Sequence, residues 1–148
     1  MSEKGGNVTQ GEPRGIRVAF VVDDGDGLTF NDRRVSKDAK LREELLRCAS
    51  ESEGALWVRP YSLDQFDQAA VRVADVPWRE AAPEDIVFVE DVDPAIISGV
   101  TEVIRFRWNR KYPSDLKSTF DLGGYELVEA ADFPGSSHER ITKEVWRK

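Results

Sequence analysis

The single histidine of the chain lies in a segment with a helix-start pattern. In GSSHERIT, residues 135–142, Ser136 and Glu139 have the S-x-x-E spacing of a capping box. His138 falls on the same helical stripe as two apolar residues that follow it, so a helix beginning here turns the imidazole toward the protein body. The pattern predicts a final helix over residues 137–146, and backbone amides at its start suit an anion beside His138.

A basic segment supplies cations that could complete such a site. RFRWNRKYPSDLK, residues 105–117, carries five basic residues and one acid. Arginine pairs suit phosphate because the guanidinium fork donates two parallel hydrogen bonds, and Trp108 and Tyr112 offer rings for stacking on a base. The predicted anion-binding residues are Arg105, Arg107, Arg110, Lys111, Ser136 and Ser137.

These residues together suggest a catalytic extension. Histidine is the side chain that most readily exchanges a proton near neutral pH, so His138 is the candidate general acid or base. Arginines would stabilise the charge that develops on a phosphodiester, which would allow metal-independent cleavage of RNA. The competing interpretation is a half-buried, hydrogen-bonded histidine and basic residues that balance nearby carboxylates. The sequence leaves both interpretations open.

An acidic turn after the first apolar run carries a second candidate chemistry. IRVAFVVDDGDGLT, residues 16–29, resembles the first motif of haloacid-dehalogenase-type phosphatases, in which a buried strand is followed by D-x-D-G-T. Asp24 and Asp26 stand in the aspartate positions and Gly27 in the glycine position, whereas Thr29 comes one place late. An Asp- and Gly-rich turn explains the same residues without a metal.

The resemblance implies further site residues in two later segments. It implies a magnesium-dependent phosphatase with Ser62 in the second motif and with metal-binding carboxylates at Glu90, Asp91 and Asp93. The family's lysine has no counterpart, because no lysine lies between Lys40 and Lys111.

Other site types are excluded by residue counts and spacing. A zinc site needs several Cys or His ligands, and the chain has one of each. The chain contains neither a phosphate-binding loop motif nor the serine elbow of α/β-hydrolases, and a Ser-His-Asp triad would have to use Ser136 or Ser137 with His138. Cys48 fits best as a small core residue. We expect no metal and no cofactor.

Composition limits the classes of partner. The chain has 148 residues and a formal net charge of −7, which argues against general attraction to nucleic acid or anionic membranes. It contains no apolar run of about 18 residues that could cross a bilayer and no secretory signal, so the sequence predicts a cytoplasmic protein without membrane contact.

The elements follow from apolar periodicity and turn residues. Residues 1–15 are expected to be a disordered tail and residues 16–148 a single globular domain. A hairpin is predicted from strands 16–22 and 28–30, with a second turn at Asn31 and Asp32, and a helix from Ser36 to about Ser52 buries Leu41, Leu45, Cys48 and Ala49. Further expected elements are strands 55–62, 85–91, 100–109 and 125–133, the last paired with 100–109, a short helix over 62–70, a helical turn over 93–99, and an ambiguous edge segment over 71–78.

These expectations combine into one fold class and three functions. The fold class is α+β, with a mainly antiparallel or mixed sheet and about two substantial helices, and α/β is the alternative. The first function is an anion-binding domain for RNA or a nucleotide phosphate, with ribonuclease activity through His138 as an extension. The alternatives are a protein-interaction module without chemistry and the magnesium-dependent phosphatase.

Overall fold

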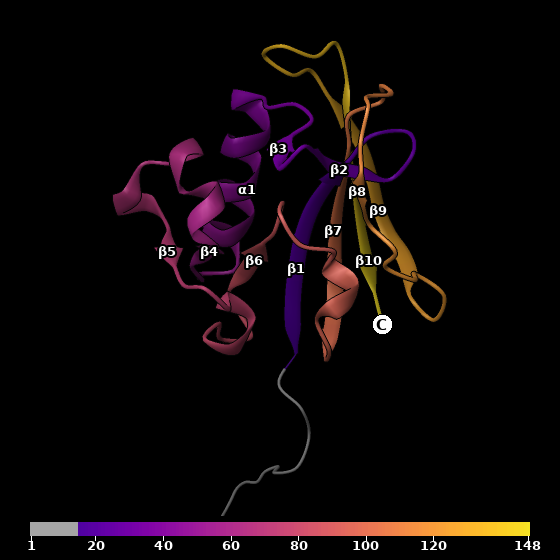
Figure 1. Ribbon diagram of the computed structural model, residues 1–148. Helices are drawn as coiled ribbons and strands as arrows, with labels where there is room; N and C mark the ends of the chain where they lie inside the picture. The colour runs from indigo at the N-terminus through magenta and orange to yellow at the C-terminus, as the bar shows by residue number, and fades with distance from the viewer. Residues whose placement is uncertain (1–14) are drawn as a thin grey trace, which may run out of the picture.

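A seven-stranded mixed sheet forms the centre of the protein (Figure 1). The computed structural model describes residues 15–148, so the expected tail lies outside the described residues except for Gly15. The strand order is β5-β4-β6-β1-β7-β10-β9. In chain order these strands are β1 (Ile16–Val22), β4 (Leu56–Val58), β5 (Arg72–Val73), β6 (Ile86–Phe88), β7 (Val100–Arg107), β9 (Glu126–Phe133) and β10 (Ile141–Arg147).

Strand β1 lies between two parallel neighbours, which explains its continuous apolar sequence. It pairs in parallel with β6 and β7, and Val18 lies opposite both Val87 and Val103. Strands of this kind are buried on both faces and therefore lack polar alternation. Strand β4 also pairs in parallel with β5 and β6. Strand β10, in contrast, pairs antiparallel with both β7 and β9. The mixed sheet confirms the predicted type of sheet. Its parallel half favours the α/β fold class, which was the alternative, over α+β.

One α-helix covers one face of the sheet. Helix α1 (Ala39–Glu51) buries the predicted stripe of Leu41, Leu45, Cys48 and Ala49. This stripe packs in one apolar cluster with side chains from β1, β6 and β7, among them Ala19, Phe88 and Ile104. The helix starts later than predicted, because the N-cap is Asp38 and not Ser36. The Asp38 carboxylate accepts a hydrogen bond from the amide of Lys40 at 2.8 Å.

The opposite face is covered by loops, short 3-10 helices and a small second sheet. Its cluster includes Phe20, Val87 and Trp146 from the strands and Phe120 and Tyr125 from the covering segments. The small sheet has the order β3-β2-β8, and the remaining elements are β2 (Gly27–Phe30), β3 (Arg33–Arg34), β8 (Leu116–Lys117), η1 (Pro60–Gln65), η2 (Gln68–Ala70), η3 (Pro77–Arg79) and η4 (Pro94–Ile96).

The expected hairpin between strands 16–22 and 28–30 is wrong. Strand β2 pairs antiparallel with β3 and β8 and leaves β1 free to pair with β6 and β7. The predicted turn at Asn31 and Asp32 is confirmed, since both residues have positive φ angles of 51° and 61° between β2 and β3. This second turn was therefore placed correctly, and it joins β2 to β3.

The expected final helix over residues 137–146 is also wrong. Residues 141–147 form strand β10, in which Ile141, Lys143 and Val145 are buried and their neighbours are partly exposed. This period of two is the strand pattern. Because β10 inserts between β7 and β9, the expected direct pairing of 125–133 with 100–109 does not occur. The described residues therefore contain one substantial helix instead of about two.

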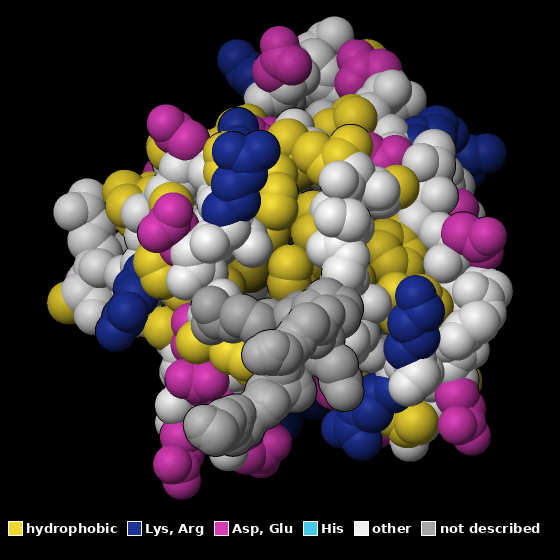
Figure 2. All heavy atoms as spheres, turned by 90° about the horizontal axis from the view of Figure 1, so that it is seen from below, with side chains coloured by type: hydrophobic (Ala, Val, Ile, Leu, Met, Phe, Trp, Pro, Cys, Tyr) yellow, Lys and Arg dark blue, Asp and Glu magenta, His cyan; other side chains and the backbone are white. Residues whose placement is uncertain are grey.

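His138 lies at the end of the sheet opposite to the one shown in Figure 2. Figure 2 shows the end seen from below, where hydrophobic side chains gather near the centre and charged side chains lie mostly around them. His138 precedes β10 and lies at the opposite end, where β1, β4, β6 and β7 have their carboxyl ends. Within residues 15–148, no helix is long and apolar enough to span a membrane.

The packing of α1 gives a direct stability prediction. Leu45 is fully buried, so Leu45→Ala should lower the free energy of unfolding by about 2–5 kcal/mol. Leu127 is 45% exposed on β9, and Leu127→Ala should change it by less than about 1 kcal/mol. Urea unfolding of both variants measures the difference, and equal effects would contradict the assignment of the core.

Candidate functional site

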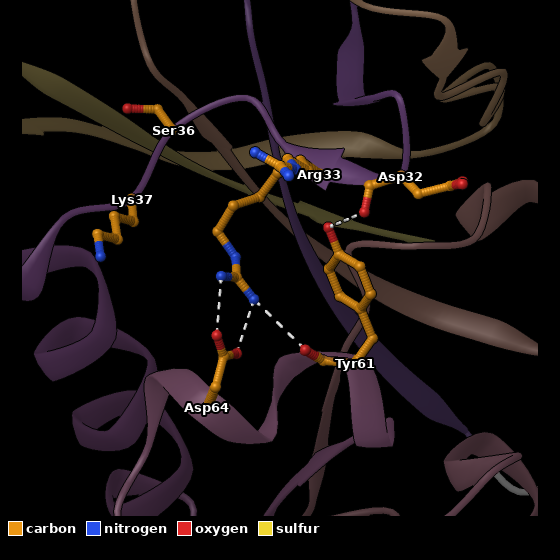
Figure 3. A pocket seen from close by; sticks show the side chains of 7 residues that line it. Asp32, Arg33, Ser36, Lys37, Tyr61 and Asp64 are labelled. Carbon is orange, nitrogen blue, oxygen red and sulfur yellow. Dashed lines mark hydrogen bonds and ion pairs between the residues drawn. The ribbon is translucent and has the colours of Figure 1, made fainter.

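A cleft of about 530 Å³ lies at the carboxyl ends of β1 and β4 (Figure 3). The loop and β3 that follow β2 form one wall, and the start of η1 forms the other. The cleft is lined by Asp32, Arg33, Arg34, Ser36, Lys37, Tyr61 and Asp64. Figure 3 shows that these side chains come from two segments that face each other across the opening.

Arg34 fixes the floor of the cleft through ion pairs. Its guanidinium lies 2.9 Å from Asp64 and 3.0 Å from Glu90, which follows β6 and is buried. Burial alone would lower the pKa of Arg34, but hydrogen bonds and charge from the two carboxylates raise it well above its ordinary value. Glu90 also accepts hydrogen bonds from Ser62 and Gln65. Arg34 is therefore a structural cation already matched by carboxylates.

A second hollow continues the cleft toward β8. It has a volume of about 500 Å³, shares Asp32 and Tyr61 with the cleft, and is also lined by Thr29, Asp91, Asp115 and Leu116. The Tyr61 hydroxyl donates to the backbone carbonyl of Asp32 at 3.0 Å, which holds the ring between the two hollows. The guanidinium of Arg34 lies 5.3 Å from the centre of this ring, within cation–π range.

Asp38 joins the start of α1 to the loop between β9 and β10. Its carboxylate accepts hydrogen bonds from the amides of Ser136 at 2.9 Å and Ser137 at 2.8 Å, in addition to Lys40. His138 Nδ1 lies 2.9 Å from the same carboxylate. The Asp38 side chain is fully buried. Burial alone raises the pKa of Asp38, but these hydrogen bonds outweigh it and hold the pKa well below its ordinary value. Asp38 is therefore a buried, ionised carboxylate.

The imidazole of His138 has contacts at both ring nitrogens and on its face. Its Nε2 lies 2.9 Å from the Ser36 hydroxyl and 3.0 Å from the Tyr112 hydroxyl. The ring stacks on Trp108 with a centre-to-centre distance of 4.4 Å. His138 and Trp108 line a third hollow of about 690 Å³ together with Asn109, Arg110, Glu139 and Arg140. The geometry confirms that His138 points into the protein body, although no helix places it there.

The predicted anion-binding residues do not share one site. Arg105 is paired with Glu144 at 2.9 Å, and by strand alternation Arg105 and Arg107 lie on the face of β7 opposite Trp108. Lys111 is exposed and lines none of the hollows described above. Of the four basic residues predicted to bind the anion, only Arg110 lines a hollow with His138. The amides of Ser136 and Ser137 are occupied by Asp38, so the protein's own carboxylate fills the expected anion position.

The carboxylates expected to bind magnesium are engaged elsewhere. The turn DDGDG is held by Asp23, whose carboxylate accepts from the amides of Gly25 and Gly27. Glu90 and Asp91 are paired with arginines, and Asp93 caps η4. Among the described residues, no group of three or more His, Cys, Asp or Glu side chains could hold a metal ion.

Sequence reasoning missed most of the residues that the structure brings together. Ser36 was predicted only as the start of a helix, and Tyr112 only as a stacking ring. Arg33 and Tyr61 were not singled out. Ser36 and Asp38 both stand just before α1, where polar residues cap a helix. Nothing in the local sequence connects them to His138, which is 100 residues from Asp38.

Comparison with known proteins identifies the fold. The sequence matches no family model and no curated protein. The structure is similar to dihydrofolate reductase from Enterococcus faecalis, solved in complex with NADP(H) and RAB-propyl, with a TM-score of 0.58. The similarity covers 90% of this chain and 96% of that chain at 10% sequence identity. The chain therefore has a dihydrofolate-reductase-like α/β fold.

This fold and the site geometry overturn the function expected from the sequence. RNA binding and ribonuclease activity through the basic strand and a final helix are wrong, because that helix is β10 and the arginines of β7 lie away from His138. The phosphatase interpretation is wrong as well, because its carboxylates do not form a metal site. The alternative of an interaction module, whose acidic surface would bind a protein partner, is not supported by the similarity to a nucleotide-binding enzyme.

The Asp38 network predicts a large effect of one substitution. Asp38→Asn removes a buried charge that receives several hydrogen bonds, and it should lower the free energy of unfolding near neutral pH by about 2–4 kcal/mol. Thermal or urea unfolding measures this. Asp64→Asn, at a 68% exposed side chain, is the matched control and should have a smaller effect.

The same network predicts a pH dependence. Because the folded pKa of Asp38 lies below its ordinary value of 3.8, its contribution is complete above that value and is lost as the pH falls through and below it. Wild-type stability should therefore fall in acid more steeply than that of Asp38→Asn. Parallel acid unfolding curves for the two proteins would show that the carboxylate contributes nothing through its charge.

Proposed function

We propose that the cleft binds a small ligand of mononucleotide type, with one phosphate or similar anionic group and one planar ring. The observation that carries this proposal is a cavity of about 530 Å³ that places Arg33 and Lys37 beside Tyr61. Its volume lies in the range of small-molecule sites, and α/β sheets bind ligands at the carboxyl ends of their parallel strands. The proposal includes the expected cytoplasmic location, where such nucleotides are abundant.

Two cations of the cleft are available to an anionic group. Arg33 and Lys37 are exposed, and neither forms a salt bridge within residues 15–148. They lie on the same short segment around β3, on one wall of the cleft. An arginine fork and a lysine ammonium together can contact a single phosphate through several charge-assisted hydrogen bonds.

Tyr61 and nearby carboxylates supply the other half of the site. Its ring lines the cleft and is held by the hydrogen bond to Asp32, so it offers a preformed surface for a base or similar ring. The carboxylates of Asp32 and Asp64 can accept hydrogen bonds from amino groups on such a ring. The combination favours a ligand with an anionic end and a planar end that donates hydrogen bonds.

The residues do not fit the dinucleotide that the similar dihydrofolate reductase carries. A pyrophosphate needs several free donors, but β6 is followed by Glu90, Asp91 and Asp93. The segment from the end of β6 to Gly99 contains no other glycine. Arg34 and Arg59, the cations nearest these carboxylates, are already paired with them. We therefore derive no hydride-transfer step for this chain.

Calorimetric titration with adenosine and guanosine monophosphates tests the proposal. Arg33→Ala/Lys37→Ala should weaken binding by roughly tenfold or more, because each lost contact to a charged group is worth about 1.5–3 kcal/mol. Arg79→Ala/Lys111→Ala removes two exposed cations outside the cleft and is the control with matched net charge. It should bind as the wild type does.

Two outcomes would contradict the proposal. Equal loss of binding in both double variants would mean that general charge, and not the cleft, holds the nucleotide. Tighter binding of NADP(H) than of a mononucleotide, with competition between the two, would show that the carboxylates after β6 do not exclude a pyrophosphate.

A further inference from the structure

Ser36, His138 and Asp38 form a continuous chain of hydrogen bonds. The Ser36 hydroxyl lies 2.9 Å from His138 Nε2, and His138 Nδ1 lies 2.9 Å from Asp38 Oδ2. Sequence analysis considered a Ser-His-Asp arrangement only with Ser136 or Ser137. In the structure both of these serines bind Asp38, and the hydroxyl on the far side of the imidazole is that of Ser36.

The bonds define which imidazole nitrogen carries the proton. Asp38 is ionised and can only accept, so Nδ1 of His138 donates to it. In the neutral ring Nε2 is then an acceptor, placed at hydrogen-bonding distance from the Ser36 hydroxyl. A nucleophile, a base within its reach and a third group that orients the base are the parts needed to activate a serine. The Tyr112 hydroxyl lies 3.0 Å from the same Nε2 and donates to the Ser36 hydroxyl at 3.4 Å.

The Ser36–His138 bond lies between two hollows of the surface. Ser36 is half-buried and lines the cleft described above, whereas His138 lines the hollow of about 690 Å³ with Trp108. In Figure 3 the Ser36 hydroxyl is turned away from Asp64, consistent with its bond to His138. Of these two hollows only the cleft is lined by Ser36, so a reactant reaches the hydroxyl from the cleft.

Unpaired hydrogen-bond donors lie around this arrangement. The indole Nε1 of Trp108 is the one buried side-chain polar atom without a hydrogen-bond partner among the described residues. A buried donor of this kind is costly unless an acceptor reaches it. The backbone amides of Ser36 and Lys37 also donate to no other group within residues 15–148. The site thus combines a serine, a base and free donors.

We propose that Ser36 is a nucleophile that accepts an acyl group from a small ester bound at the edge of the cleft that Ser36 lines. The Ser36 oxygen forms a bond to the carbonyl carbon while its proton passes to His138 Nε2. The ester bond to the alcohol then breaks, and the leaving alkoxide takes the proton from His138. Water, deprotonated by His138, releases the acid and restores the serine. The backbone amides of Ser36 and Lys37 are the donors available to the developing oxyanion.

This proposal is independent of nucleotide binding. It needs Ser36, His138 and Asp38 but neither Arg33 nor Lys37. Nucleotide titration and serine reactivity can therefore succeed or fail separately.

A fluorophosphonate probe, with mass spectrometry of the digested adduct, tests the nucleophile in the wild-type protein. The account predicts one adduct on Ser36, which Ser36→Ala abolishes. His138→Gln should slow labelling by roughly a hundredfold or more, the usual share of a general base. Ser50→Ala removes an exposed serine of α1 and should label as the wild type does.

Hydrolysis of p-nitrophenyl acetate tests turnover through the acyl-serine. Ser36→Ala should abolish it, and His138→Gln should lower kcat by roughly a hundredfold with little change in KM. Circular dichroism confirms that each variant is folded. The proposal fails if millimolar probe leaves wild-type Ser36 unmodified, if the adduct lies on another residue, or if labelling is unaffected by His138→Gln.

Discussion

The buried carboxylate of Asp38 is the interaction on which the site depends. A fully buried charge is unfavourable unless hydrogen bonds replace the water it has lost. Here the replacements come from the first turn of α1 and from Ser136, Ser137 and His138 in the loop before β10. One side chain thereby caps the only long helix of the described residues, fixes the loop that leads into β10 and orients the imidazole.

The cleft follows from the parallel half of the sheet. Because β1, β4 and β6 run in the same direction, the segments that leave their carboxyl ends meet at one edge and cannot close over it completely. Arg34 joins two of these segments through Asp64 and Glu90, and this pairing leaves the neighbouring Arg33 facing solvent. The fold is similar to that of a reductase, and in this chain the carboxylates of Glu90, Asp91 and Asp93 follow β6 at this edge.

Hydrophobic periodicity in the sequence correctly predicted β1 and α1. The continuous apolar run of β1 and the buried stripe of α1 were both correct, because strand burial and helical periodicity are written in adjacent residues. Residues 141–147 failed because the preceding S-x-x-E spacing mimics a helix start, while pairing with β7 and β9 decides the outcome. The Ser36–His138–Asp38 chain could not be predicted, since the loop and helix meet only through the tertiary fold.

The most direct test of the central role of Asp38 is the ¹⁵N NMR spectrum of the histidine side chain, which is unambiguous because the chain has one histidine. For the neutral ring the account predicts the proton on Nδ1, bonded to Asp38 and slow to exchange, and an unprotonated Nε2. A ring protonated at Nε2, or a side-chain proton that exchanges rapidly with water, would contradict the arrangement from which both the loop position and the serine activation are derived.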